Sequence, residues 1–429
     1  DNGVSIFWLG GVMDTHTNGN CTLELSGKTL RIAPVTGTDG RLAEKIAASC
    51  VAHSDGSTEL TQLAVDIPMF QELSSVLLSI ETISIAPGVA APPDASGLFS
   101  DLVGLQNVVG LENLDTSASA NLSELFARCP QLREIDLSPL DTSSVTDMSD
   151  LFRDSLGLLA ISLADLDTSH VTTMRSMFDG ASSLRSLDLS GLDTSQVTDM
   201  SYLFDHCRSL ESLDLSSFDT SSVTTMDYLF GGCLSLETLD LSGFDTSNVT
   251  SMYRMFDYCV NLRTLDLTGL DTSKVTDMSN LFDYCQTLEE LDLSGFDTSH
   301  VTSMYGMFSE CRCLKHLNLR GLDTSRVTTM FYMFYDCLDL EELDLSSFDT
   351  SSVTDMCGMF SFCRSLRELD LSGFETSKVT DMSSMFSDCR ALERLDISSF
   401  DEGNVTCMAG MFDGCAALAE VVLAGSVRH

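Results

Sequence analysis

The fold is decided by a 26-residue stretch, Asp245-Thr-Ser-Asn-Val-Thr-Ser-Met-Tyr-Arg-Met-Phe-Asp-Tyr-Cys-Val-Asn-Leu-Arg-Thr-Leu-Asp-Leu-Thr-Gly-Leu270. The chain of 429 residues repeats this stretch, with substitutions but without a gap, from Asp115 onward. An acidic residue opens each of twelve copies, at positions 115, 141, 167, 193, 219, 245, 271, 297, 323, 349, 375 and 401. A fixed period of this length predicts a solenoid, in which each repeat buries its apolar face against its neighbours.

Each repeat combines two apolar patterns. Segment 262–267 ends in alternating leucine and aspartate, which is typical of a strand with leucine inward and Asp266 outward. In segment 249–259 the apolar residues are spaced three and four apart, which predicts a short helix capped by Thr250. The polar corner 245–247 joins the two, because short polar side chains can bond their own backbone in a tight turn. The fold class expected is an α/β repeat: a right-handed leucine-rich-repeat solenoid of short parallel strands and short helices.

The beginning of the chain does not repeat. Segments 21–26, 28–33 and 81–86 alternate apolar with polar residues, so a small, mainly β N-terminal cap is expected there. Such a cap would cover the apolar end of the first repeat. The expected divisions are a cap over residues 1–95, a solenoid over 96–424 that opens with a degenerate half-repeat at 96–114, and a truncated tail at 425–429.

The charge of the chain limits its partners. The formal net charge is -41, from 64 acidic and 23 basic residues. This balance argues against nucleic acid and against anionic membranes, which both attract Lys and Arg. No apolar run approaches the length of a membrane helix, so no membrane insertion is expected within this chain. The chain starts at Asp1 without Met, which indicates a processed or trimmed chain, so an export signal or surface anchor could lie outside it.

Most of the fifteen cysteines fall in one column of the repeat. Parallel side chains about 5 Å apart are poorly placed for a disulfide, so buried thiols are expected in this column. Cys21 and Cys50 lie outside the repeats and form a candidate disulfide pair. The cysteines of the column are Cys129, Cys207, Cys233, Cys259, Cys285, Cys311, Cys337, Cys363, Cys389 and Cys415.

The repeat resembles a known family, the BspA-like 26-residue leucine-rich repeats of bacterial surface proteins. The resemblance rests on Leu239-Asp-Leu-Ser-Gly-Phe-Asp-Thr-Ser-Asn-Val-Thr250 followed by Met-x-x-Met-Phe-x-x-Cys, and it covers residues 96–424. It implies an exported protein of the bacterial cell surface that adheres to host proteins or other cells. It supplies no catalytic residues, and no Ser/His/Asp or Cys/His arrangement can be argued from the sequence, so an enzyme is not expected.

The outward aspartate of the strand recurs in nine repeats. Unit charges about 5 Å apart repel by roughly 0.8 kcal/mol in water and by about 3 kcal/mol at an effective dielectric near 20. Three effects remain as ways to offset this repulsion: hydrogen bonds from neighbouring groups, raised pKa values, and bound cations such as Ca²⁺. Apart from Ca²⁺, no cofactor is expected. The candidate metal ligands are Asp188, Asp214, Asp240, Asp266 and Asp292.

Aromatic residues concentrate in the variable positions of the middle repeats. On a helix these positions would form one exposed face, and clustered exposed aromatic residues are typical of protein recognition surfaces. The alternative is that the rings pack on neighbouring repeats. The candidate partner-binding residues are Tyr202, Tyr228, Tyr253, Tyr258, Tyr284, Tyr305, Phe331, Tyr332, Tyr335 and Phe362.

Three functions therefore remain open. The first is a protein-binding or glycan-binding adhesion module that uses the variable positions of the repeats. The second is a structural spacer that holds another domain away from the cell. The third is a calcium-dependent surface protein that uses the aspartate column.

Overall fold

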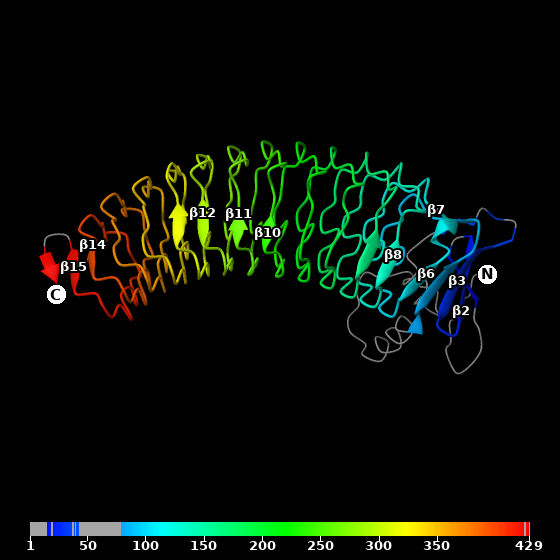
Figure 1. Ribbon diagram of the computed structural model, residues 1–429, viewed down its shortest axis with the longest axis horizontal. Coiled ribbons are helices and arrows are strands. Elements are labelled where there is room, and N and C mark those ends of the chain that lie inside the picture. Colours follow the sequence, from blue (N-terminus) through cyan, green and yellow to red (C-terminus); the bar gives the residue numbers. More distant parts are fainter. Residues whose placement is uncertain are drawn as a thin grey trace. The chain divides into compact units, whose positions relative to one another are not determined.

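The computed structural model describes residues 15–18, 20–36, 38, 40–42, 79–423 and 426–428. The chain divides into two compact units, Asp1–Val197 and Thr198–His429. Figure 1 shows that stacked coils of backbone make up the second unit. The same kind of coil follows the sheet of the first unit.

The first unit begins with a five-stranded sheet in the order β1-β2-β3-β4-β6. Strands β1, β2 and β3 pair antiparallel, whereas β3 with β4 and β4 with β6 pair in parallel. The predicted cap therefore shares its sheet with the predicted half-repeat, which supplies β6. The elements are β1 (Thr15–Asn18), β2 (Cys21–Ser26), β3 (Thr29–Pro34), β4 (Thr82–Ile85), β5 (Val89–Ala90), β6 (Asn107–Val109), the 3-10 helix η1 (Leu111–Asn113), β7 (Leu114–Asp115), β8 (Glu134–Asp136) and β9 (Ala160–Ser162).

In the second unit, strands of neighbouring coils pair in parallel without a shift of register, because they stand one repeat apart. Thr264 lies opposite Thr238, and His316 opposite Glu290. The segment predicted to be a truncated tail contributes β16, which pairs antiparallel with β15. The strands are β10 (Thr238–Leu239), β11 (Thr264–Leu265), β12 (Glu290–Asp292), β13 (His316–Asn318), β14 (Arg394–Asp396), β15 (Glu420–Leu423) and β16 (Ser426–Arg428).

The predicted solenoid of short parallel strands is confirmed, but the predicted short helices are wrong. Across residues 80–423, the 3-10 helix η1 is the one helical element, and the segments expected to be helical are turns. In every repeat the tenth and fourteenth residues have a left-handed backbone, as Arg254 (φ 55°) and Tyr258 (φ 57°) do. Their N–H groups donate to the next coil, to the carbonyl oxygens of Ser279 at 3.0 Å and Asp283 at 2.8 Å. These bonds between coils replace the bonds within a helix.

The spacing of the coils explains why no helix forms. Packed helices stand about 8–10 Å apart, whereas paired strands stand about 4.8 Å apart. A helix in each of many coils stacked at strand spacing would not fit. Successive tight turns place apolar residues three and four apart as a helix does, so the sequence pattern could not distinguish the two.

The core of the second unit is a ladder of phenylalanine rings. From Phe204 to Phe412, rings of successive coils stack with their centroids 5.5–5.9 Å apart. The rings from Phe204 to Phe386 are fully buried, and the Val, Met and Leu columns line the same core. Burying rings of this size is a large stabilising contribution that neighbouring coils make to each other.

Two polar columns bond neighbouring coils rather than capping helices. The hydroxyl of Thr250 donates to the carbonyl oxygen of Thr224 at 3.1 Å, and its equivalents repeat this contact along the unit. The predicted helix cap at Thr250 is therefore wrong. In the cysteine column the buried thiol of Cys259 donates to the carbonyl oxygen of Phe230 at 3.2 Å. Ser155 replaces cysteine in its repeat and makes the equivalent bond to Phe126 at 2.7 Å.

The candidate disulfide between Cys21 and Cys50 stays a prediction. Cys21 is buried in β2, with its Sγ 2.8 Å from the carbonyl oxygen of Gly40. Cys50 lies outside the described residues.

Gly358 occupies a left-handed position whose space is filled by a neighbouring ring. Its φ is 59°, and a Cβ there would lie 2.1 Å from Cε1 of Tyr332. Gly358→Ala is therefore expected to lower the free energy of unfolding by about 1–3 kcal/mol, from strain and displacement of the ring. Gly373→Ala is the matched control, because a Cβ at Gly373 meets nothing within 4 Å. Urea unfolding of both variants tests this difference, and equal losses would refute it.

Candidate functional site

The ten predicted aromatic residues all lie on the turns of the second unit. Six occupy left-handed positions: Tyr202, Tyr228, Tyr258, Tyr284, Tyr332 and Phe362. The other four each precede such a position: Tyr253, Tyr305, Phe331 and Tyr335. A left-handed backbone costs a residue with a side chain about 1–2 kcal/mol. The backbone at the six left-handed residues is therefore strained.

The structure brings these rings into three groups, which are held together by stacking and edge contacts. Of the ten, Tyr258 and Tyr305 keep the largest exposed fractions, 43% and 37%. The remaining rings are half-buried, so packing on neighbouring coils accounts for part of the band. The ring centroid distances are 4.6 Å for Tyr202–Tyr228, 5.4 Å for Tyr228–Tyr253, 4.1 Å for Tyr258–Tyr284, 5.1 Å for Tyr305–Phe331, 4.0 Å for Phe331–Tyr332, 4.6 Å for Tyr332–Tyr335 and 5.5 Å for Tyr335–Phe362.

Arg254 contacts two rings of the first aromatic group and also a buried carboxylate. Its guanidinium carbon lies 5.6 Å from the ring centroid of Tyr228 and 5.5 Å from that of Tyr253. Its NH1 group also donates to Oδ2 of Asp257 at 2.8 Å. Contacts of a cation with aromatic faces stabilise both groups, and they hold this guanidinium in place.

Asp257 is 3% exposed and Asp283 is 8% exposed, although both occupy the repeat position of Tyr335, which was predicted to face outward. For these two residues the expectation was wrong, because the helix that would have placed them outward is replaced by turns. Among the described residues, Oδ1 of each carboxyl group is buried without a hydrogen-bond partner. Burial raises the pKa of Asp257 to about 6 and, together with the charge of Asp257, raises the pKa of Asp283 to about 7.

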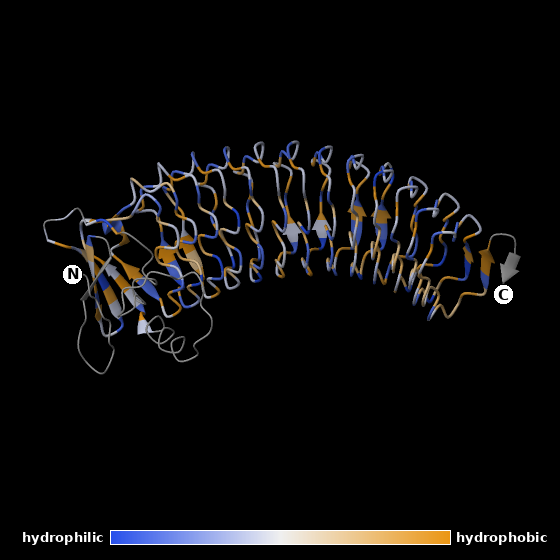
Figure 2. Cartoon of the chain, turned by 180° about the vertical axis from the view of Figure 1, so that it is seen from behind, coloured by the Kyte–Doolittle hydropathy of each residue, from blue (hydrophilic) through white to orange (hydrophobic). Residues whose placement is uncertain are grey.

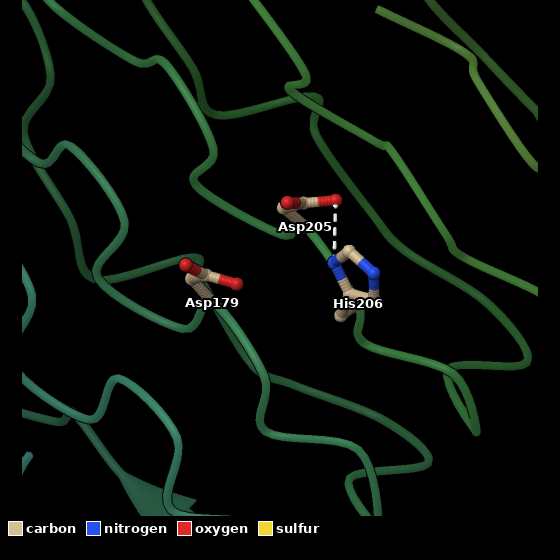
Figure 3. A group of neighbouring side chains, drawn as sticks. All are labelled: Asp179, Asp205 and His206. Atoms are coloured by element: carbon tan, nitrogen blue, oxygen red, sulfur yellow. Dashed lines mark ion pairs between the residues drawn. The ribbon is translucent and has the colours of Figure 1, made fainter. Parts of the chain in front are cut away.

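Other buried carboxylates of the same turns contact His or Arg side chains. Nδ1 of His206 lies 3.0 Å from Oδ1 of Asp205, the ion pair drawn in Figure 3. Arg312 contacts both Glu310 at 2.6 Å and Asp336 at 2.8 Å. Asp283 differs from these groups because no ion pair holds its carboxylate within the described part of the chain, and Arg254 is already bonded to Asp257.

A groove runs along the strand face of the second unit and was not predicted. It has a volume of about 2010 Å³ and is lined by strand residues between Leu239 and Asp396. The parallel strands that form its floor lie side by side on one face (Figures 1 and 2). Leucine side chains point into the core, so the groove presents the charged residues that alternate with them.

The aspartate column in this groove is satisfied by hydrogen bonds. Oδ1 of Asp266 accepts the backbone N–H of Thr268 at 3.0 Å and its hydroxyl at 2.8 Å. These bonds hold the pKa of Asp266 below its usual value, as the equivalent bonds do for Asp240 and Asp292. Hydrogen bonding is therefore the observed way in which the repulsion between these carboxylates is offset. Raised pKa values do not offset it at Asp240, Asp266 and Asp292, because the pKa of each is lowered.

Strand β13 interrupts the acidic groove. The repeats beside it carry three outward acidic residues each: Glu289, Glu290 and Asp292 before it, and Glu341, Glu342 and Asp344 after it. At the same positions the repeat of β13 has Lys315, His316 and Asn318, followed by Arg320. A basic stripe therefore crosses the groove between two acidic patches.

The repeats of the chain match a protein-family model. The model described as "Mycoplasma protein of unknown function, DUF285" matches residues 94–188, 184–265, 259–343 and 337–424, which is more than half of the chain. The chain belongs to the DUF285 family. These overlapping matches cover all of the predicted solenoid, 96–424. The leucine-rich-repeat character is confirmed by the fold, whereas the finer BspA-like designation stays a prediction.

Solved leucine-rich-repeat structures are similar to this DUF285 chain at low identity. A leucine-rich repeat protein from Eubacterium ventriosum is 16% identical over 95% of this chain and 96% of its own, with a TM-score of 0.42. A leucine rich cell surface protein from Faecalibacterium prausnitzii is 16% identical over 97% of each chain, with a TM-score of 0.36. The comparison with curated proteins gives no match. Within the described residues, the DUF285 chain has no helix of the length and apolar character needed to cross a bilayer.

The groove of this DUF285 chain had a signal in the sequence. The position before the strand alternates in charge through seven repeats: Glu237, Arg263, Glu289, Lys315, Glu341, Arg367 and Glu393. This alternation places opposite charges on neighbouring coils, and Lys315 pairs with Glu289 at 3.1 Å. The aspartate column alone does not reveal this order.

The calcium hypothesis for Asp188, Asp214, Asp240, Asp266 and Asp292 can be tested by melting. Because hydrogen bonds already offset the repulsion between these carboxylates, we expect the same melting temperature in millimolar calcium as in chelator. A rise of several degrees in calcium, absent with magnesium, would contradict this expectation and support a calcium site.

Proposed function

We propose that this chain is an exported bacterial cell-surface protein that acts as a binding or adhesion module, without enzymatic activity, for a protein or glycan partner. The observation that carries the proposal is the strand-face groove. Its floor includes the hydrogen-bonded strand pairs β10–β11 and β12–β13 above a fully buried core, so the side chains on these strands are held by a rigid support.

The composition of the groove supports a binding role. The leucine, phenylalanine and cysteine columns are nearly constant, whereas the residues around each strand, such as Thr264, Glu290 and His316, differ from coil to coil. A constant framework with varied exposed side chains is how a solenoid presents a specific surface. The acidic excess of the chain disfavours nucleic acid as the partner.

Attachment of chain-coated beads to host cells and matrix proteins tests this function. The groove variant replaces Asp240, Asp266 and Asp292 by Asn, which keeps the acceptor for the backbone N–H and removes three charges. The matched corner variant replaces Asp245, Asp271 and Asp297 by Asn in overlapping repeats. We expect at least a fivefold loss of attachment for the groove variant and no loss for the corner variant.

The aromatic band is a second candidate surface for the same function. Tyr258 and Tyr305 supply exposed aromatic area, which protein and sugar partners both use. Replacing both residues by Ser should weaken attachment if the band binds a partner. Full attachment by this double variant would assign the band to packing.

The spacer alternative is favoured by the stacking of the rings on one another, which needs no partner. A spacer would keep its role in both the groove variant and the aromatic variant. Unchanged attachment by all variants would therefore replace the binding proposal with the spacer.

A further inference from the structure

Each acidic patch of the groove lies one coil away from the basic stripe. The outward residues of the repeats on either side of β13 remain exposed, including Glu342, Asp344 and Glu290. The core rings of these three coils, Phe282, Phe308 and Phe334, stack 5.8 and 5.5 Å apart, so negative, positive and negative stripes follow one another within about 10 Å. A partner lying along the solenoid would meet all three stripes at once.

The contacts that neutralise the stripe within the chain are weak. Lys315 lies 3.1 Å from Glu289, and Arg320 lies 3.5 Å from Asp344. Asn318 donates to Oδ1 of Asp292 at 3.0 Å. All of these groups except Asn318 are exposed, and such surface pairs contribute little to stability, so a partner's charges can replace them at low cost.

An excess of negative charge remains on both sides of the basic stripe. Glu290, Glu341 and Glu342 have no ion pair among the contacts found for the described residues. Their carboxylates are exposed, Glu290 on β12 and the other two on the coil that follows β13. A partner with positive groups on both sides would therefore find unpaired carboxylates in each patch, whereas its middle would face Lys315 and Arg320.

We propose that the groove binds a protein segment in which an acidic residue is flanked on both sides by basic residues, with the acidic residue over β13. The inference rests on the proposed binding function and narrows its partner to one charge order. A uniformly basic segment would place like charges over Lys315 and Arg320, which disfavours it. A uniformly acidic segment would be repelled by both patches.

Two synthetic peptides of equal composition separate charge order from net charge. The central-acid peptide is Lys-Lys-Gly-Asp-Gly-Lys-Lys, and the terminal-acid peptide is Asp-Gly-Lys-Lys-Lys-Lys-Gly, both with blocked ends. Titration at low ionic strength should show the chain binding the central-acid peptide about threefold more tightly. The double variant Asn318→Asp, Arg320→Ser gives β13 the residues found at Asp344 and Ser346, so it should fold and lose this preference.

Each result decides something. Equal affinity of the unaltered chain for both peptides would overturn the charge-order inference while leaving the binding function intact. A preference that survives in the double variant would also overturn it. If neither peptide binds, or if binding is unchanged in the groove variant, the inference fails; bead attachment then decides separately whether the proposed function fails too.

Discussion

Replacing Phe282 by alanine is expected to lower the free energy of unfolding by about 3–5 kcal/mol, the usual loss for a fully buried ring. Phe282 is fully buried and stacks between Phe256 at 5.6 Å and Phe308 at 5.8 Å. The substitution removes the ring's burial and both stacking contacts, and it leaves a cavity at the junction of three coils. Since each coil contacts only its neighbours, the array should also unfold less cooperatively at this point.

Urea unfolding followed by circular dichroism measures this loss. Phe362→Ala is the matched control, because Phe362 is half-buried and contacts Tyr335 by its edge at 5.5 Å. Its loss should be clearly smaller than that of Phe282→Ala, because a half-buried ring loses less burial and an aromatic pair adds only about 0.5–1.5 kcal/mol beyond burial. Similar losses for the two variants would contradict the assignment of the phenylalanine ladder as the core.

Asp283→Asn is expected to stabilise the chain by up to about 4 kcal/mol above pH 8, because a tenfold change in an acid dissociation constant corresponds to about 1.4 kcal/mol. The pKa of Asp283 is raised from 3.8 to about 7 by burial and by the nearby carboxylate of Asp257. Because the folded state binds a proton that the unfolded state has released, stability falls as pH rises from about 4 to about 7. Asparagine is never ionised and avoids this loss.

Unfolding experiments at several pH values test the sign of this effect. The advantage of Asp283→Asn should be large at pH 8.5, smaller near pH 6 and nearly absent near pH 4. Asp271→Asn is the control, because hydrogen bonds from Ser273 lower the pKa of Asp271, so its ionised form favours folding above the unfolded pKa. That variant should lose stability slightly at pH 7. An advantage of Asp283→Asn that does not depend on pH would show that burial of charge is not its cause.

Opposite pKa shifts should set the pH of greatest stability. Exposed aspartates such as Asp240 and Asp266 have lowered pKa values, so the stability they contribute is lost as pH falls below about 4. Asp257 and Asp283 have raised pKa values of about 6 and about 7, so they reduce stability as pH rises through that range. The two effects together place the maximum between them, in mildly acidic solution.

The sequence was sufficient to predict the solenoid because the 26-residue period continues without a gap. The recurrence of Phe256 and Leu262 in all twelve repeats, and of Val249 and Cys259 in most of them, predicted which residues are buried, and all four are buried. The aspartate corner was also correctly interpreted, since Asp245 accepts the N–H of Ser247 at 3.0 Å. These features depend on local sequence patterns that recur along the array.

The turns could not be predicted from the same patterns. Residues such as Tyr202 and Arg254 seldom adopt a left-handed backbone, and only the bonds to the next coil hold them there. A helix in place of these turns would put Asp257 on an exposed face, whereas the structure buries it. The groove depends on residues brought together from seven repeats, so its charge order becomes visible only when the strands are aligned.

Carboxyl footprinting of the chain bound to the central-acid peptide tests most directly whether the strand face is the binding surface. A carbodiimide labels accessible carboxylates, and mass spectrometry reads each position. We expect protection of Asp266, Glu290 and Glu342 on binding, with unchanged labelling of the corner residues Asp271 and Asp297. Protection of the corner residues, or unchanged labelling of the strand face in the complex, would contradict a binding surface on the strands.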